Sequence, residues 1–136
     1  MLRGQSVFVL VLSWTLVSCD PGWSFGSELS VTGPVSRECV SDAVVLVSTI
    51  AMEKESSESL SVEYRHGARK GFVNIEARRV TIGWGALGQP PGRDEAARLR
   101  EISDKLGAAV LRACAVQQTA ETTFCRVDGG AANLCD

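Results

Sequence analysis

Histidine is almost absent from this chain, since His66 is the single one among 136 residues. A histidine acting as general base needs a partner side chain, and His66 stands in a stretch that predicts an exposed turn. The G-x-S-x-G pattern of hydrolases is missing, and Gly83, Gly85 and Gly88 do not follow the G-x-G-x-x-G pattern of dinucleotide sites. We therefore predict no catalytic residue and no cofactor.

An excess of positive charge is also lacking. The chain has 14 Lys and Arg against 16 Asp and Glu, which gives a formal net charge of −2. No basic run is interleaved with aromatic residues, so nucleic acid is not an expected partner. The spacings of the five cysteines are all longer than the two to four residues typical of a zinc site, and no metal site is predicted.

No apolar run reaches the roughly 20 residues that a membrane-spanning helix needs. The run at the N-terminus, Val7–Val17, has about eleven residues and is interrupted by Ser13 and Thr15. Arg3 precedes it and small residues follow it. A charged start, an apolar middle and small residues at the end are typical of a secretory signal, so residues 1–18 are predicted to be a signal peptide.

Leu16-Val17-Ser18-Cys19 closes this segment and resembles the lipobox of bacterial lipoproteins. The resemblance covers residues 1–19. It implies cleavage before Cys19, a diacylglycerol on its thiol and an acyl chain such as palmitate on the new amine. Stable attachment to a membrane needs two or more such chains. The alternatives are an ordinary cleaved secretory protein and an uncleaved anchor.

The same resemblance implies a location on the bacterial cell membrane, lipid-anchored and facing the periplasm. Asp20 follows Cys19 and resembles the signal that keeps lipoproteins of enteric bacteria in the inner membrane. That rule varies between bacteria, so the inner and the outer membrane both remain open.

Residues 19–35 are predicted to be the lipidated cysteine and a flexible tether, because Gly, Ser and Pro are frequent there. Trp23 and Phe25 within it could contact the membrane interface or pack onto the domain. Residues 36–136 are long enough for a single small domain.

Four cysteines remain when Cys19 is set aside. An even number in a small exported domain is typical of two disulfides, and four cysteines allow three connectivities, among which the sequence does not choose. The disulfide candidates are Cys39, Cys114, Cys125 and Cys135.

The apolar pattern predicts an α+β domain. Val40, Val44 and Val47 recur at helical spacing, although the β-branched run 44–47 would also suit a strand. Helices are predicted for 36–50 and 94–113, strands for 60–65, 72–77 and 80–84, and a short strand for 122–127. We expect a two-layer sandwich of helix, three-stranded antiparallel meander and helix, with a disulfide-pinned C-terminal tail.

Two basic clusters could bind an anionic partner such as a lipid headgroup, a cell-wall polymer or an acidic protein. Arg65, Arg69 and Lys70 form one, and Arg78 with Arg79 forms the other. A meander would place them at opposite ends of the sheet, which argues against a single patch, and solvated loops are the interpretation that the sequence favours. Trp84 could serve recognition or core packing.

These patterns favour a membrane-anchored cell-envelope lipoprotein with a small binding or accessory domain. Its partners would be the membrane, through the lipid, and an envelope protein or a cell-wall component. The alternatives are a small inhibitor or immunity-type lipoprotein, and an envelope enzyme whose site is assembled by the fold from carboxylates that leave no local pattern.

Overall fold

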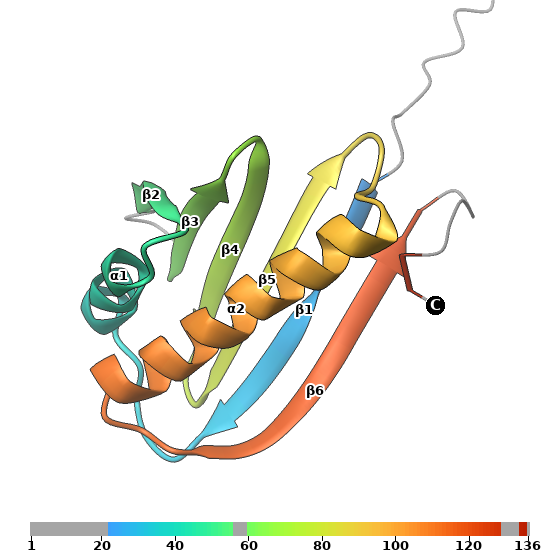
Figure 1. Cartoon of the computed structure of the whole chain (residues 1–136). Coiled ribbons are helices and arrows are strands. Elements are labelled where there is room, and N and C mark those ends of the chain that lie inside the picture. The colour runs from blue at the N-terminus through green and yellow to red at the C-terminus, as the bar shows by residue number, and fades with distance from the viewer. Residues whose placement is uncertain (1–21, 56–59, 129–133, 136) are drawn as a thin grey trace, which may run out of the picture.

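The computed structural model describes residues 22–55, 60–128 and 134–135, which form one antiparallel sheet with two helices on the same face (Figure 1). The predicted signal peptide 1–18, Cys19 and Asp20 lie outside the described residues. In chain order the elements are β1 (Gly22–Val31), α1 (Arg37–Leu46), β2 (Ala51–Glu55), β3 (Ser61–His66), β4 (Arg69–Glu76), β5 (Arg79–Leu87), α2 (Arg93–Ala113) and β6 (Gln118–Val127). Among the described helices, neither is long and apolar enough to cross a membrane.

The strand order is β2-β3-β4-β5-β1-β6, and each neighbouring pair is antiparallel. The strands β2 to β5 follow one another along the chain. β1 instead lies between β5 and β6, so that Trp23 pairs with Ala86 on one side and with Val127 on the other. The predicted three-stranded meander between two helices is therefore wrong, because β2, β1 and β6 extend the sheet to six strands.

The predicted tether is also wrong over most of its length. Residues 22–31 are β1, which is hydrogen-bonded to a strand on each side. Trp23 and Phe25 are 4% and 0% exposed and pack in the core, so they do not contact a membrane interface. The folded domain therefore includes residues 22–35 and does not begin at residue 36. The two-residue period of a strand was present, since the buried residues of β1 are Trp23, Phe25, Leu29 and Val31.

α1 confirms the helix predicted within 36–50. The hydroxyl of Ser36 accepts a hydrogen bond from the backbone N–H of Cys39 at 3.2 Å, which satisfies one of the free donors of the first turn. The helix ends at Leu46, and Val47 is its C-cap with extended backbone angles. The alternative strand over 44–47 is thereby excluded.

α2 confirms the helix predicted for 94–113, with its start one residue earlier. Asp94 and Glu95 lie in the first turn and Arg112 in the last, where their charges complement the helix dipole. The buried side of the helix carries Ala96, Leu99, Ile102, Leu106 and Val110.

The core lies between the helices and the face of the sheet that they cover. Its centre is an edge-to-face contact between Tyr64 of β3 and Trp84 of β5, whose ring centroids are 4.9 Å apart. Both rings keep their polar atoms satisfied: Tyr64 donates to the Gly83 carbonyl and Trp84 Nε1 donates to the Leu99 carbonyl, each at 2.8 Å. Burial raises the pKa of Tyr64, so the phenol stays neutral.

One glycine of this core is required by packing. The ring of Tyr64 lies against the backbone of Gly71 on the neighbouring strand, where a Cβ atom would overlap the ring. On the opposite face, which we call the open face because no helix covers it, the rings of Phe72 and Phe124 lie above Gly83 with their centroids 6.5 Å apart. Aromatic rings thus shield strand glycines on both faces.

Candidate binding groove between α2 and β6

The helices cover the sheet unevenly. α1 packs on β2 and β3, and α2 packs on α1 and β5, so the helix-side face of β6 stays partly open (Figure 1). Two adjoining cavities of about 300 and 570 Å³ lie between α2 and β6. They form one groove because both are lined by Ser27, Ser103, Asp104 and Glu121.

Local periodicity directs these side chains into the groove. On α2, Arg100 lies three and four residues before the adjacent pair Ser103 and Asp104, and Gly107 lies four and three residues after them, so these residues share one side of the helix. On the sheet, Thr123 lies opposite Ser27 and Glu121 lies opposite Leu29, so all four side chains point to the helix side. The groove wall is polar, whereas Leu29 and Ile82 form an apolar floor.

Two carboxylates dominate the charge of the groove. Burial raises the pKa of Asp104, and the negative charge of Glu121 raises it further. The two groups therefore repel each other across the space between helix and strand. A cation placed between them would relieve that repulsion, and the hydroxyls of Ser27 and Thr123 would offer it further oxygen atoms.

Arg100 closes the groove at its Cys135 end. Its guanidinium donates to the Leu134 carbonyl at 3.0 Å and lies 5.1 Å from the centroid of the Phe25 ring. The hydroxyl of Ser103 donates to the Arg100 carbonyl at 3.0 Å, so its proton is used in a hydrogen bond within α2. Within the described ranges, no group of three or more His, Cys, Asp or Glu residues could hold a metal ion.

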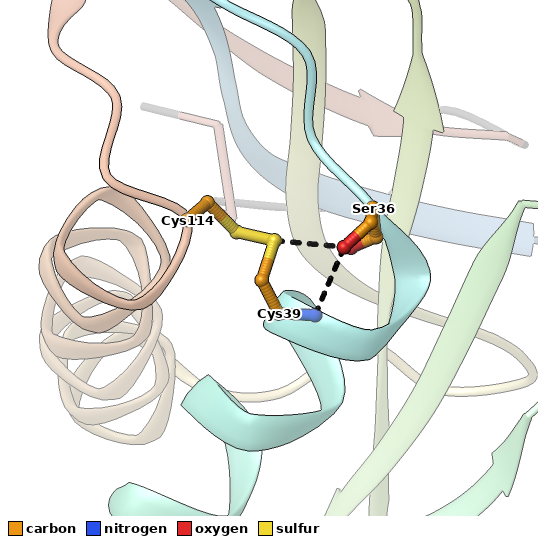
Figure 2. Close-up of a disulfide and its surroundings, with 3 residues drawn as sticks. All are labelled: Ser36, Cys39 and Cys114. Carbon is orange, nitrogen blue, oxygen red and sulfur yellow. Dashed lines mark hydrogen bonds between the residues drawn. A yellow bond between two sulfur atoms is a disulfide. The ribbon is translucent and has the colours of Figure 1, made fainter.

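The four candidate cysteines form two disulfides. Cys39 at the start of α1 is bonded to Cys114 at the end of α2, over 75 residues of sequence (Figure 2). Cys125 of β6 is bonded to Cys135, only 10 residues away. The prediction of disulfides is confirmed, and the connectivity that the sequence left open is now assigned. Cys19 lies outside the described residues.

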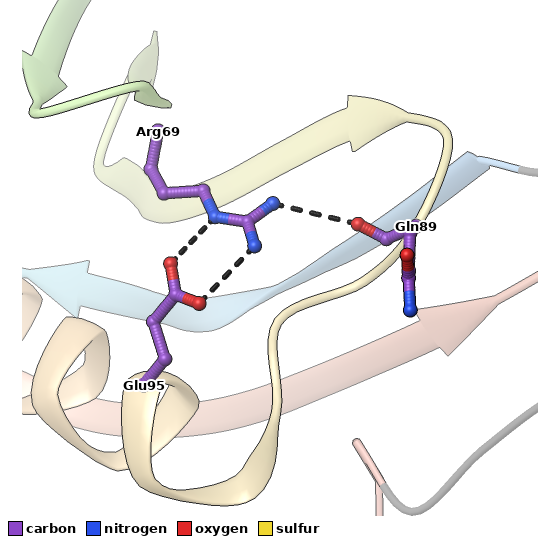
Figure 3. A network of polar contacts seen from close by, with 3 residues as sticks. All are labelled: Arg69, Gln89 and Glu95. Carbon is purple, nitrogen blue, oxygen red and sulfur yellow. Dashed lines mark hydrogen bonds and ion pairs between the residues drawn. The ribbon is translucent and has the colours of Figure 1, made fainter.

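The two basic clusters lie at opposite ends of the sheet, because β4 runs from one to the other. In the first, Arg69 makes two hydrogen bonds to Glu95 of α2 and one to the Gln89 carbonyl (Figure 3). The hydrogen bond from Arg69 lowers the pKa of Glu95.

Three further cations of these clusters, Arg65, Lys70 and Arg79, are paired with carboxylates as well. Arg65 and Lys70 both face Glu53, and the hydrogen bond from Arg65 lowers the pKa of that carboxyl. Arg79 faces Glu28 and Glu76. These ion pairs link neighbouring parts of the sheet: Arg65 and Lys70 are joined to β2 through Glu53, and Arg79 is joined to β1 through Glu28.

Two further candidates have structural roles. His66 is the last residue of β3 and is half-buried, and not in a turn as predicted; its Nδ1 donates to the Thr49 carbonyl at 2.7 Å. Trp84 is fully buried, so the core-packing interpretation is confirmed and the recognition role is wrong.

The groove residues were missed by the sequence analysis. Asp104 and Ser103 lie beside the apolar stripe of α2, where polar residues are normal, and Glu121 precedes the predicted short strand. Only the pairing of β6 with β1 brings Glu121 near α2. This pairing could be predicted from the sequence only if residues 22–31 were identified as a strand.

Comparison with protein-family models, with curated proteins and with solved structures finds no match to this chain.

Proposed function

We propose that this protein is an exported bacterial lipoprotein, anchored in the cell membrane through Cys19, whose domain binds a partner of the cell envelope in the groove between α2 and β6. The proposal assigns no catalytic step to the domain. Its partner is a positively charged segment of another envelope protein.

The cysteine pairing carries the proposal. The chain has five cysteines, and four of them are consumed by Cys39–Cys114 and Cys125–Cys135. The one left over is the cysteine of the lipobox. Two disulfides also suit an oxidising compartment outside the cytoplasm. This pairing therefore supports both export and an available thiol at Cys19.

The groove supports a binding role because its chemistry matches one kind of partner. Two carboxylates face the same space, and the raised pKa of Asp104 reflects both burial and its acidic neighbour. A Lys or Arg side chain entering the groove would neutralise this repulsion. The hydroxyl groups on both walls would then accept or donate the remaining hydrogen bonds.

The anchor is tested by the intact mass of the protein purified from a bacterial membrane fraction, beside a Cys19→Ala variant. We expect a mature chain that starts at Cys19 and carries several acyl chains, and a variant without them that leaves the membrane fraction. A wild-type mass that shows cleavage elsewhere and no acyl group would contradict the lipoprotein assignment.

The groove is tested by capture from envelope extracts with a double variant, Asp104→Asn with Glu121→Gln. We expect the captured partner to be lost in this variant and in high salt, because the attraction is electrostatic. Glu101→Gln is the matched control, since Glu101 lies on the same helix and pairs with Lys105. Equal capture by the double variant and the wild type would rule out the groove as the site.

A further inference from the structure

The distance between the lipidated residue and the sheet is short. Only Asp20 and Pro21 separate Cys19 from Gly22. Three residues of fully extended chain span at most about 11 Å. The headgroup layer on each side of a bilayer is roughly 5–8 Å thick. The start of β1 must therefore lie at the membrane surface when Cys19 carries lipid.

We propose that one end of the sheet rests on the bilayer and that Leu87 enters its interface. This end, here called the anchor end, consists of Gly22, Leu87, Ala68 and Gln89. The proposal rests on the proposed lipidation of Cys19 and names the surface that the anchor presses against the lipid.

The anchor end is built from three segments that meet at the start of β1. Gly22 pairs with Leu87 of β5, and its carbonyl accepts from the Asp128 N–H at 2.8 Å. The turn between β3 and β4 and the connection between β5 and α2 lie at the same end of the sheet (Figure 1). Because β1 is held on both sides, Gly22 cannot peel away to lengthen the link.

The surface at this end is suited to an interface between water and hydrocarbon. Leu87 is 78% exposed, more than any other large hydrophobic residue in the described part of the chain, and Ala86 and Ala68 beside it are exposed as well. Lys70 and Arg126 lie nearby on the open face, and their long side chains can reach lipid phosphates. Each of these cations already has a carboxylate neighbour. The apolar contact of Leu87, and not these charges, therefore decides which surface of the domain meets the bilayer.

The segments of the anchor end are also linked to one another by side-chain contacts. Arg69 links the β3–β4 turn to Glu95 in the first turn of α2 and to the Gln89 carbonyl, and its guanidinium lies 5.5 Å from the centroid of the Trp23 ring (Figure 3). These contacts hold Leu87 and its neighbouring loops as one surface. Contact with the bilayer would therefore fix the orientation of the whole domain.

The opposite end of the sheet supplies a matched control. Leu60 is 56% exposed and directly precedes β3, and its carbonyl accepts from the Ile75 N–H near the end of β4. It is an exposed leucine of the same kind, about one strand length away from the anchor end. Nonspecific adsorption of exposed leucines to lipid would bring both Leu60 and Leu87 into the bilayer interface. A contact positioned by the lipid anchor would bring only Leu87 there.

The test uses the full-length lipidated protein in vesicles of phosphatidylethanolamine and phosphatidylglycerol. Leu87→Cys and Leu60→Cys variants are each labelled with a polarity-sensitive fluorophore, and lipids brominated near the headgroup serve as quenchers. We expect a blue-shifted, strongly quenched label at position 87 and an unquenched label in water at position 60.

An acylated protein whose two labels both stay in water would overturn the membrane contact and leave the proposed anchor intact. Equal quenching at both positions would also overturn it, since the anchor end would then not be the contacting surface. A wild-type mass without acyl chains would overturn the proposed function and this contact together.

Discussion

The helix-side face of the sheet has two unlike regions. Over β2 to β5, here called the covered region, the helices bury residues such as Val62, Val73 and Val80 completely. At β6, here called the margin, Glu121 and Thr123 are exposed beside a polar groove. Stability is thus concentrated in the covered region. The margin is left free to carry a site.

The largest expected difference in unfolding free energy between the two regions comes from their disulfides. Loop-closure entropy predicts that removing Cys39–Cys114 costs roughly 4.5 kcal/mol and removing Cys125–Cys135 roughly 2.5–3 kcal/mol. The pairs are replaced by serine and the variants are unfolded in urea. A larger loss for Cys125–Cys135 would place the main stabilising link in the margin and reverse the comparison.

The second test compares two buried tryptophans. Trp84 Nε1 donates to the Leu99 carbonyl, whereas the buried Nε1 of Trp23 has no hydrogen-bond partner among the described residues. Both Trp→Phe changes remove similar apolar volume, but only Trp23→Phe removes an unsatisfied donor. We expect Trp84→Phe to destabilise more, by about 2 kcal/mol. Equal losses in denaturant titrations would show that the Trp23 donor is satisfied in solution.

The third test compares two glycines. A Cβ at Gly71 would overlap the Tyr64 ring, so Gly71→Ala should cost about 1–3 kcal/mol. A Cβ at Gly107 meets only Leu29 and Ile82, at 3.6 and 3.7 Å, which is ordinary contact. Gly107→Ala should therefore stabilise the helix by about 0.5–1 kcal/mol. Thermal melts of both variants check the opposite signs.

The smallest expected effect depends on pH. The pKa of Asp104 is raised by burial and by Glu121, so the folded state binds this proton more tightly than the unfolded state. The ionised carboxylate therefore lowers stability above that pKa, and the penalty disappears as the pH falls through it. Asp104→Asn should raise the Tm slightly at neutral pH and leave it unchanged in strong acid.

Glu95 should behave in the opposite way. The hydrogen bond from Arg69 lowers its pKa, so its ionised form stabilises the fold above the ordinary glutamate pKa. That contribution is lost as the pH falls through the lowered value. Glu95→Gln should lower the Tm at neutral pH, and the loss should vanish in acid. Parallel shifts of both variants would refute the assigned electrostatics.

Regular periodicity made part of this fold predictable. The stripe of α2 and the alternation of 60–84 were assigned correctly because each carries a strong local pattern. β1 was not predicted as a strand because four of its five open-face positions hold glycine or serine, a composition typical of a flexible tether. The groove depends on the pairing of β1 with β6, about a hundred residues apart in sequence, and no local pattern encodes such a contact.

The central place of β1 also sets an order of events. The first strand to be synthesised is seated between the last two, since Gly22 pairs with Leu87 and Trp23 with Val127. Pairings so distant in sequence make folding slow, in the range of milliseconds to seconds for sheets of this kind. The pairing of β1 on both sides is therefore completed only after β6, the last strand of the described residues, has been synthesised.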